Sequence, residues 1–346
     1  MILVRYWAWW FNKVPLSILL VLLLVDGERL TYSALAALLG VVAIVCCVAN
    51  YGYALNELFD IEEDRRGARA NVAATVGRAR MWSTIVLSAA SALVLAACCA
   101  GFAGGSLTAG ELMLPLAYSI PPLRVKERGW LGVLADAAAA HVYPAMLALV
   151  VVQCLSIRSY ALPFVLTVGI WSSATGLRGI LSHQLHSEED DRATSLATVV
   201  HQYGHETIRR LVVFGILPIE VAAFCAIIMQ SHSTALFKTV WLVFMLYELL
   251  KFRLNAFPVV VFKREGQAYV PFVDEGFYKV WGPLALALDA SLSHPLYSIF
   301  APFYALLFRP RVLMEWVQIR ATAAVAFRRI ANLVVGSRGN RSFDNE

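Results

Sequence analysis

The sequence predicts an all-α polytopic membrane protein, a bundle of about nine transmembrane helices around a central cavity. Of its 346 residues, 59% are hydrophobic and only 15% are charged, whereas a soluble globular domain has about 25% charged residues. The mean hydropathy is +0.65. Apolar runs long enough for membrane helices recur from one end of the chain to the other, so no large part of it is expected to be soluble.

Nine apolar runs are candidates for the membrane-crossing segments. Backbone polar groups cannot remain unpaired in lipid, so runs of this length are expected to be helices. A β-barrel would need alternating polarity, and these runs are apolar on all sides. In chain order they are residues 14–25, 33–55, 82–104, 106–119, 131–152, 161–182, 211–230, 235–250 and 281–308.

Basic residues are concentrated in alternate loops. The loops after the second, fourth, sixth and eighth runs carry most of the arginines and lysines, whereas the opposite loops before the final run contain only Arg29 and Arg158. By the positive-inside rule, the basic loops and the N-terminus face the cytoplasm. We therefore expect a multi-pass protein of the plasma membrane with its active site on the cytoplasmic side. The net charge of +5 fits contact with anionic membrane lipid and requires no nucleic acid.

The basic C-terminal tail, residues 309–346, conflicts with an odd number of crossings. Nine crossings would place the tail outside the cell, although it is rich in arginine. Either the final run, which is interrupted by Asp289, His294 and Pro295, is re-entrant or crosses twice, or the tail departs from the rule. Residues 312–335 alternate apolar and basic positions at helical spacing, which predicts a helix on the membrane surface. The arginines of the tail are Arg309, Arg311, Arg320, Arg328, Arg329, Arg338 and Arg341.

An acidic segment begins where the second apolar run ends. Asn56, Asp60 and Asp64 are spaced four residues apart, which places them on one face of a helix over roughly 12 Å. Such a ladder suits a diphosphate that is bridged through one or two metal ions. Mg²⁺ prefers oxygen ligands, which it shares between a few carboxylates and substrate phosphates. The alternative is a solvated helix end, with ordinary ion pairs to Arg65 and Arg66.

A second polar segment follows the fourth run and begins at Tyr118. Its two prolines end the helix and make the turn rigid. Arg124, Lys126 and Arg128 then lie at the membrane face that also holds the acidic segment. Arginine binds phosphate through two parallel hydrogen bonds, and lysine acts as a point charge. Anchoring by the positive-inside rule would also account for the three basic residues.

A third polar segment starts at His183 and Gln184. It continues into four consecutive carboxylates, residues 188–191, which repel one another unless cations neutralise them. A bound metal ion would do so, and so would water and Arg192. Lys13, which precedes the first apolar run, lies at the same face, where it can meet a phosphate or extend along the membrane interface.

The order of these segments resembles the UbiA superfamily of intramembrane prenyltransferases over most of residues 5–300. The pattern Asn56-x-x-x-Asp60-x-x-x-Asp64 looks like the first aspartate motif of that family. The segment Tyr118-Ser-x-Pro-Pro-Leu-Arg-x-Lys is similar to its connection between the fourth and fifth helices. The stretch from residue 183 to residue 204 takes the place of its second aspartate motif.

The resemblance implies a helix bundle over residues 1–308, with a cavity that is open to lipid and capped by cytoplasmic loops. It also implies Mg²⁺ as cofactor, an isoprenyl diphosphate as substrate and a hydrophobic, aromatic acceptor. The catalytic residues would be Asp60, Asp64 and Asp191. The metal ligands would be Asn56, Asp60, Asp64, Glu188, Asp190 and Asp191. The substrate-binding residues would be Lys13, Asn56, Tyr118, Arg124, Lys126, Arg128, His183 and Gln184.

The second aspartate motif departs from the family pattern, which has two aspartates four residues apart. If Thr198 sets the register, Asp191 is the second aspartate and Ser187 occupies the position of the first. If Asp190 is the second, His186 occupies the first position. One carboxylate is missing in both registers. Three functions therefore remain: a Mg²⁺-dependent prenyltransferase, a terpene cyclase that acts on an isoprenyl diphosphate, and a non-catalytic or transport protein.

Overall fold

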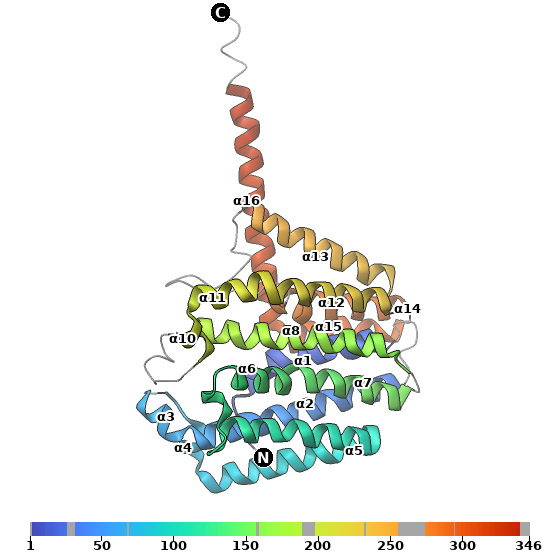
Figure 1. The fold of residues 1–346 in the computed structure, drawn as a ribbon. Coiled ribbons are helices and arrows are strands. Elements are labelled where there is room, and N and C mark those ends of the chain that lie inside the picture. The colour runs from blue at the N-terminus through green and yellow to red at the C-terminus, as the bar shows by residue number, and fades with distance from the viewer. Residues whose placement is uncertain are drawn as a thin grey trace, which may run out of the picture.

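The predicted all-helical class is confirmed. The computed structural model describes residues 2–25, 32–67, 69–156, 159–188, 198–231, 233–254, 274–293 and 295–339, and no strand occurs within these ranges. The long helices lie side by side in one bundle (Figure 1). This is the arrangement expected when apolar helices can bury their surfaces only against one another or against lipid.

The bundle is built from both uninterrupted and composite helices. The N-terminal half contains α1 (Tyr6–Leu24), α2 (Tyr32–Phe59), α3 (Ile61–Arg66), α4 (Val72–Val76), α5 (Arg78–Ser119), η1 (Val125–Glu127), α6 (Trp130–Ala137), η2 (Ala138–Val142) and α7 (Tyr143–Ser156). The C-terminal half contains α8 (Leu162–His186), α10 (Val199–Tyr203), α11 (His205–Arg210), η3 (Leu211–Ile216), α12 (Leu217–Gln230), α13 (Ala235–Leu254), η4 (Asp274–Trp281), α14 (Gly282–Ser293), η5 (Pro295–Ile299), α15 (Phe300–Leu307) and α16 (Arg309–Gly339).

Six helical stretches of the described chain are long and apolar enough to cross a membrane. They are Tyr6–Leu24, Tyr32–Phe59, Arg78–Ser119, Trp130–Leu155, Leu162–His186 and His205–Gln230. These stretches cover the first seven of the nine predicted runs, because α5 contains two of them. The last two runs are helical where they are described but fall outside the six stretches, so the count of nine is not confirmed.

α5 is a helical hairpin. Its backbone leaves the helical conformation at Ala100 (φ −142°, ψ 23°) and Gly101 (φ 58°, ψ −144°). The chain then folds back so closely that a Cβ atom on Gly104 would lie 2.5 Å from the backbone oxygen of Ala96. The Gly101 conformation is one that only glycine adopts without strain. This glycine therefore allows two neighbouring membrane segments to be joined with almost no loop.

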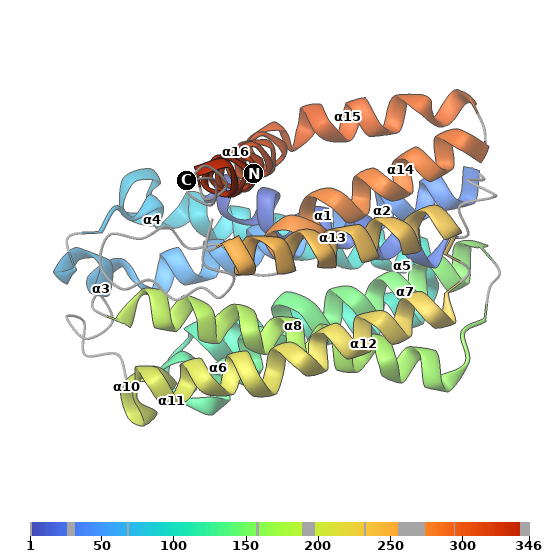
Figure 2. The same cartoon turned by 90° about the horizontal axis from the view of Figure 1, so that it is seen from above.

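The final apolar run also folds back on itself. α14 and α15 lie side by side (Figure 2), and the Tyr304 hydroxyl of α15 donates to the Lys279 carbonyl at 2.7 Å. At the start of α16, Arg311 Nη2 lies 2.5 Å from Asn12 Oδ1 of α1. The tail therefore begins at the membrane face that holds the N-terminus. Of the two alternatives for this run, the structure supports the one in which it is re-entrant or crosses twice.

α16 runs across the direction of the bundle helices and extends beyond them (Figure 1). Arg329 Nη2 donates to the Leu254 carbonyl at 3.0 Å, which holds α16 against the end of α13. Exposed apolar side chains such as Trp316 and Phe327 alternate with arginines along the helix. This is the orientation and composition expected of a helix that lies along a membrane surface.

The C-terminal helices pack through an aromatic core. The core contains Trp171 of α8, Phe224 of α12, Trp241 of α13 and the neighbouring rings of Phe277 and Tyr278. The ring centroids of contacting pairs lie 4.6–6.3 Å apart. The Trp171 indole N–H donates to the Tyr278 hydroxyl at 3.0 Å. This bond satisfies the indole N–H of Trp171, so that ring can be buried without an unpaired donor.

The fold places the tail and the acidic segment on one side of the membrane, and cysteine labelling tests this. In a variant without native cysteines, we expect Glu62→Cys and Arg328→Cys to react with a membrane-impermeant maleimide from the same side of sealed vesicles. Phe102→Cys, at the turn of the α5 hairpin where the side chain is 91% exposed, should react only from the other side. Labelling of Arg328→Cys together with Phe102→Cys would contradict the fold.

The α5 hairpin depends on the absence of a side chain at Gly104. Gly104→Ala should destabilise the protein by about 1–3 kcal/mol, because the added methyl group overlaps the opposing backbone. Gly105→Ala is the matched control, since its Cβ would meet only Ala97 Cβ at an ordinary 3.7 Å. The midpoint of thermal unfolding in detergent measures both. Equal midpoints for the two variants would mean that the close approach is not needed.

Candidate active site

A cavity of about 910 Å³ lies between the helices of the N-terminal half and α8. Four residues of the predicted site line it: Lys13 from α1, Asn56 from α2, Tyr118 from α5 and His183 from α8. Its remaining wall is largely apolar, with Val45, Val48, Ala49, Leu114 and Pro115 among the lining residues. A volume of this size is typical of a site for a small organic ligand.

Asp60 is the central carboxylate of the acidic segment. It lies at the break between α2 and α3 and is only 6% exposed. Lys126 Nζ lies 2.6 Å from Asp60 Oδ1, and Arg124 Nη2 lies 3.4 Å from the same oxygen. Burial raises the pKa of Asp60, and the Lys126 charge acts in the opposite direction. The two polar segments, which were predicted to lie at the same membrane face, are therefore joined by direct ion pairs.

Arg124 links three carboxylates. In addition to Asp60, its guanidinium contacts Glu63 Oε2 at 2.5 Å and Glu127. Lys126 also reaches Glu63, at 3.2 Å. Arg124 adopts a positive φ of 32°, a conformation that costs a non-glycine residue about 1–3 kcal/mol and is concentrated at functional sites. The fold therefore holds this arginine in a strained conformation while it faces the acidic segment.

Asp64 is held by an amide instead of a cation. Asn71 Nδ2 donates to Asp64 Oδ2 at 2.8 Å and to the Glu57 carbonyl at 2.8 Å. The Asn71 side-chain oxygen caps α4 by accepting from the Ala74 N–H at 2.9 Å. These bonds fix the loop after α3 on the end of α2. The Asp64 N–H donates to the Asp60 carbonyl at 2.8 Å, so the two aspartates lie one helical turn apart.

Some predicted site residues lie elsewhere. Arg128 is exposed and donates to the Pro122 carbonyl at 2.7 Å instead of joining the acidic segment. Gln184 is buried but is not among the residues that line the cavity. Glu188 contacts His205 Nδ1 at 2.9 Å. Asp190 and Asp191 lie outside the described residues, so the register of the second acidic segment stays a prediction.

The cavity also contains ionisable residues that the sequence analysis did not select. Glu111 of α5 and Asp136 of α6 both line it, as does Arg5, which pairs with the buried Glu57. Lys13 lines the same cavity as these two carboxyl groups. The signal was present in the sequence, because a carboxylate inside an apolar membrane run is rare and marks a functional site by default.

The donor chemistry of the acidic segment fits magnesium. Asn56, Asp60, Glu63 and Asp64 offer only oxygen ligands, which Mg²⁺ prefers. Among the described residues, no three His, Cys, Asp or Glu side chains come together as a complete metal-binding group. This is compatible with Mg²⁺, which keeps several waters and takes its other ligands from substrate phosphates.

The fold and the cavity define a polytopic membrane protein whose ionisable site lies at one end of a helix bundle. Residues 14–257 match the model of the UbiA prenyltransferase family. The match covers most of the chain, which therefore belongs to this family of prenyltransferase-type proteins. A search of curated proteins finds no match.

Solved structures of archaeal UbiA homologues share this fold. A homologue from Archaeoglobus fulgidus bound to DMAPP and Mg²⁺ matches with a TM-score of 0.59 and 16% identity, over 86% of this chain and 98% of that chain. The complex of the A. fulgidus homologue with GPP and Mg²⁺ matches equally, at 15% identity. The apo structure of a homologue from Aeropyrum pernix K1 has a TM-score of 0.57 and 15% identity, over 91% of this chain and 100% of that chain.

The Lys126–Asp60 ion pair should stabilise the unliganded fold. Lys126→Met leaves a buried carboxylate with a weaker partner, so we expect a loss of about 1–3 kcal/mol. Arg128→Met is the matched control, because that cation is exposed and should contribute within about 0.5 kcal/mol. Thermal unfolding in detergent at neutral pH measures the difference. A Lys126 variant as stable as the Arg128 variant would show that the pair contributes nothing to the fold.

Proposed function

We propose that this protein transfers an isoprenyl group from an isoprenyl diphosphate to a lipid-soluble, aromatic acceptor within the membrane, with Mg²⁺ as cofactor. The observation that carries the proposal is the contact of Lys126 and Arg124 with Asp60, beside a cavity with a largely apolar wall. The homologue structures bound to DMAPP or GPP together with Mg²⁺ support it, as does membership of the family.

The metal would be held by the oxygen donors of the first acidic segment, Asn56, Asp60 and Asp64. Carboxylates of the second segment, among Glu188, Asp190 and Asp191, would complete the set. When bound, Mg²⁺ neutralises charge on the diphosphate and so makes it a better leaving group. Asn71 would keep Asp64 oriented, because its amide already donates to the carboxylate at 2.8 Å.

Lys126 and Arg124 supply the cations of the site. In the structure they neutralise Asp60 and Glu63, and a diphosphate beside Asp60 would lie within reach of both. As the C–O bond to the diphosphate breaks, its electron pair stays on the leaving group. Fixed cations that face this oxygen stabilise the transition state more than the ground state. Arg124 can bind two phosphate oxygens at once, whereas Lys126 acts as a compact point charge.

The cavity would hold the isoprenyl chain and the carbocation that forms on it. Its apolar residues, such as Val45, Val48 and Leu114, would surround the isoprenyl chain and keep water from the allylic carbocation. The acceptor would then form the new bond at the cationic carbon and release a proton. Because the charged groups lie at the end that carries the basic loops, the positive-inside rule would place this site at the cytoplasmic face of the plasma membrane.

The Asp60→Asn variant tests the proposal against a closely matched control. Purified protein is incubated with Mg²⁺, isoprenyl diphosphates of increasing chain length and a panel of phenolic acceptors, and diphosphate release is measured. Asp60→Asn should lower the rate about a hundredfold or more, because the metal would lose a charged ligand. Glu62→Gln, in the same segment but exposed and paired with Arg65, should leave the rate unchanged.

The products separate the proposal from its alternatives. Acceptor-dependent diphosphate release, with a prenylated acceptor seen by mass spectrometry, supports the transferase. Release without acceptor that yields a cyclic hydrocarbon would replace it with the cyclase. An absence of release with every diphosphate would contradict both catalytic functions. Equal rates for Asp60→Asn and Glu62→Gln would contradict the assignment of the site.

A further inference from the structure

A second polar layer lies deeper in the cavity than the acidic segment. Glu111 precedes Ser119 by eight residues on α5, and the Ser119 hydroxyl donates to Asn56 Oδ1 at 3.5 Å. At 1.5 Å per residue, Glu111 is about 12 Å along the helix from the level of Asn56. Lys13 and Asp136 line the same cavity, and the proposed transfer of the isoprenyl group makes no use of either carboxylate.

Glu111 lines the cavity and has a buried oxygen without a hydrogen-bond partner among the described residues. Its side chain is 1% exposed, and Glu111 Oε2 accepts no hydrogen bond from the described part of the chain. Buried polar atoms in native proteins nearly always have a partner, and an exception calls for an explanation. An unpaired oxygen on a residue that lines a ligand-sized cavity is explained if a ligand supplies the missing donor.

The charges around this layer favour a donor over an anion. Lys13, Glu111 and Asp136 all line the cavity, so two acidic side chains share one lysine there. Arg5, which also lines the cavity, is paired with Glu57. A ligand carboxylate here would be buried beside two acidic side chains in a poorly solvated space, where a further negative charge is costly.

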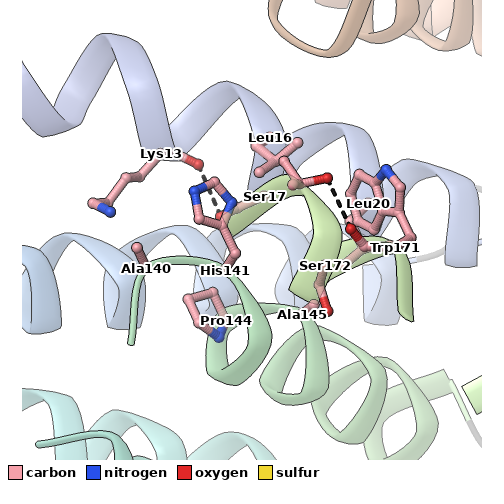
Figure 3. A pocket seen from close by; sticks show the side chains of 11 residues that line it. Lys13, Leu16, Ser17, Leu20, Ala140, His141, Pro144, Ala145, Trp171 and Ser172 are labelled. Atoms are coloured by element: carbon pink, nitrogen blue, oxygen red, sulfur yellow. Dashed lines mark hydrogen bonds between the residues drawn. The ribbon is translucent and has the colours of Figure 1, made fainter. Parts of the chain in front are cut away.

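The layer continues into a small pocket of about 20 Å³ that also includes Lys13 and His141 (Figure 3). Ser17 in this pocket donates to the Lys13 carbonyl at 3.0 Å, and Trp171 closes part of its wall. The pocket shares Lys13, Ala140, His141 and Pro144 with the main cavity. Beyond the polar layer there is therefore space of only about one water molecule.

We propose that Glu111 and Asp136 form the acceptor subsite, and that it takes acceptors with a proton-donating group, a hydroxyl or an amine, in preference to carboxylates. The identity of the ligand as the acceptor rests on the proposed function. The isoprenyl diphosphate would bind at Asp60, and the acceptor would extend from the reacting carbon towards Glu111. Glu111 is thus a specificity-determining residue that accepts a hydrogen bond from the acceptor.

Two naphthalene probes of equal ring size test this preference. 2-Naphthol presents a neutral hydroxyl at neutral pH, and 2-naphthoic acid presents a carboxylate. Binding of each to the full-length protein in detergent is measured by equilibrium dialysis against protein-free micelles. We expect the wild type to bind 2-naphthol at least about tenfold more tightly, and Glu111→Gln to reduce this preference about tenfold, because an amide replaces the carboxyl group that accepts the hydrogen bond.

Glu315→Gln is the matched control for this experiment. Glu315 is a buried carboxylate with an unsatisfied oxygen, 4% exposed, but it lies on α16 and does not line the cavity. It should keep the wild-type preference. If Glu111→Gln lowers the thermal midpoint strongly, Asp136→Asn takes its place with the same expectation. A wild type that prefers 2-naphthoic acid, or an unchanged preference in both cavity variants, would overturn the proposal.

Binding of a non-hydrolysable isoprenyl thiolodiphosphate with Mg²⁺ separates the subsite from the proposed function. This binding should be the same in the wild type and in Glu111→Gln, because Glu111 lies far from Asp60. If Glu111→Gln fails to bind the analogue while the wild type binds it, Glu111 is not a residue of a separate acceptor subsite and the proposal is overturned. If the wild type does not bind the analogue but keeps its preference for 2-naphthol, the proposed function is wrong while the binding preference stands.

Discussion

The high energetic cost of charge in apolar surroundings is the constraint on which this structure depends. Two kinds of ion pair reduce this cost by neutralising buried charges. Arg178 of α8 and Glu220 of α12 form a fully buried pair with two contacts, one of them at 3.0 Å between Nη2 and Oε1. Lys126 and Asp60 form the other kind, at the end of the bundle. Removing one partner of a buried pair is strongly destabilising, so each pair fixes the elements that carry it.

The two kinds of pair differ in what can replace them. Arg178 and Glu220 satisfy each other across a helix interface, and neither lines the cavity. Arg124 and Lys126 instead share Asp60 and Glu63 in an overlapping set of contacts. Such shared contacts can be exchanged when a dianionic ligand arrives with a divalent cation, because the total charge of the site stays balanced. The first pair therefore serves the fold, and the second suits a site that must accept and release charged groups.

Much of the fold could be predicted from the sequence because lipid leaves the backbone few choices. Seven of the nine runs correspond to stretches that can cross a membrane. The exact positions of the two hairpin turns could not be predicted from hydropathy. The break at Gly101 falls inside the predicted run 82–104. For the final run, the interruption by Asp289, His294 and Pro295 left re-entry or a second crossing as one of two alternatives. A tight turn in an apolar run has little signature in composition, although the arginines of the tail did conflict with an odd number of crossings.

The parts of the site that depend on the spacing of residues along the chain could be predicted. The parts that depend on the direction in which a side chain points could not. Lys126 contacts Asp60, and Asp64 lies one helical turn after Asp60 in the structure. His183 lines the cavity whereas Gln184 does not, because consecutive residues on a helix point about 100° apart. Arg128 had the right charge but points away. Glu111 and Asp136 were visible as charges within apolar runs, but the sequence does not show that they face one cavity.

The return of the chain through α14 and α15 connects the tail to this same site. Phe308 stacks on Trp10 with ring centroids 5.7 Å apart, and Arg311 contacts Asn12, a residue that lines the cavity. A surface helix that starts here would fix the depth of the cavity relative to the lipid headgroups. An isoprenyl diphosphate is itself divided into a charged head and an apolar chain. A site with its cations at the end of the bundle and its apolar wall within the bundle matches that division, and α16 would keep both parts at the depth at which such a substrate lies in the membrane.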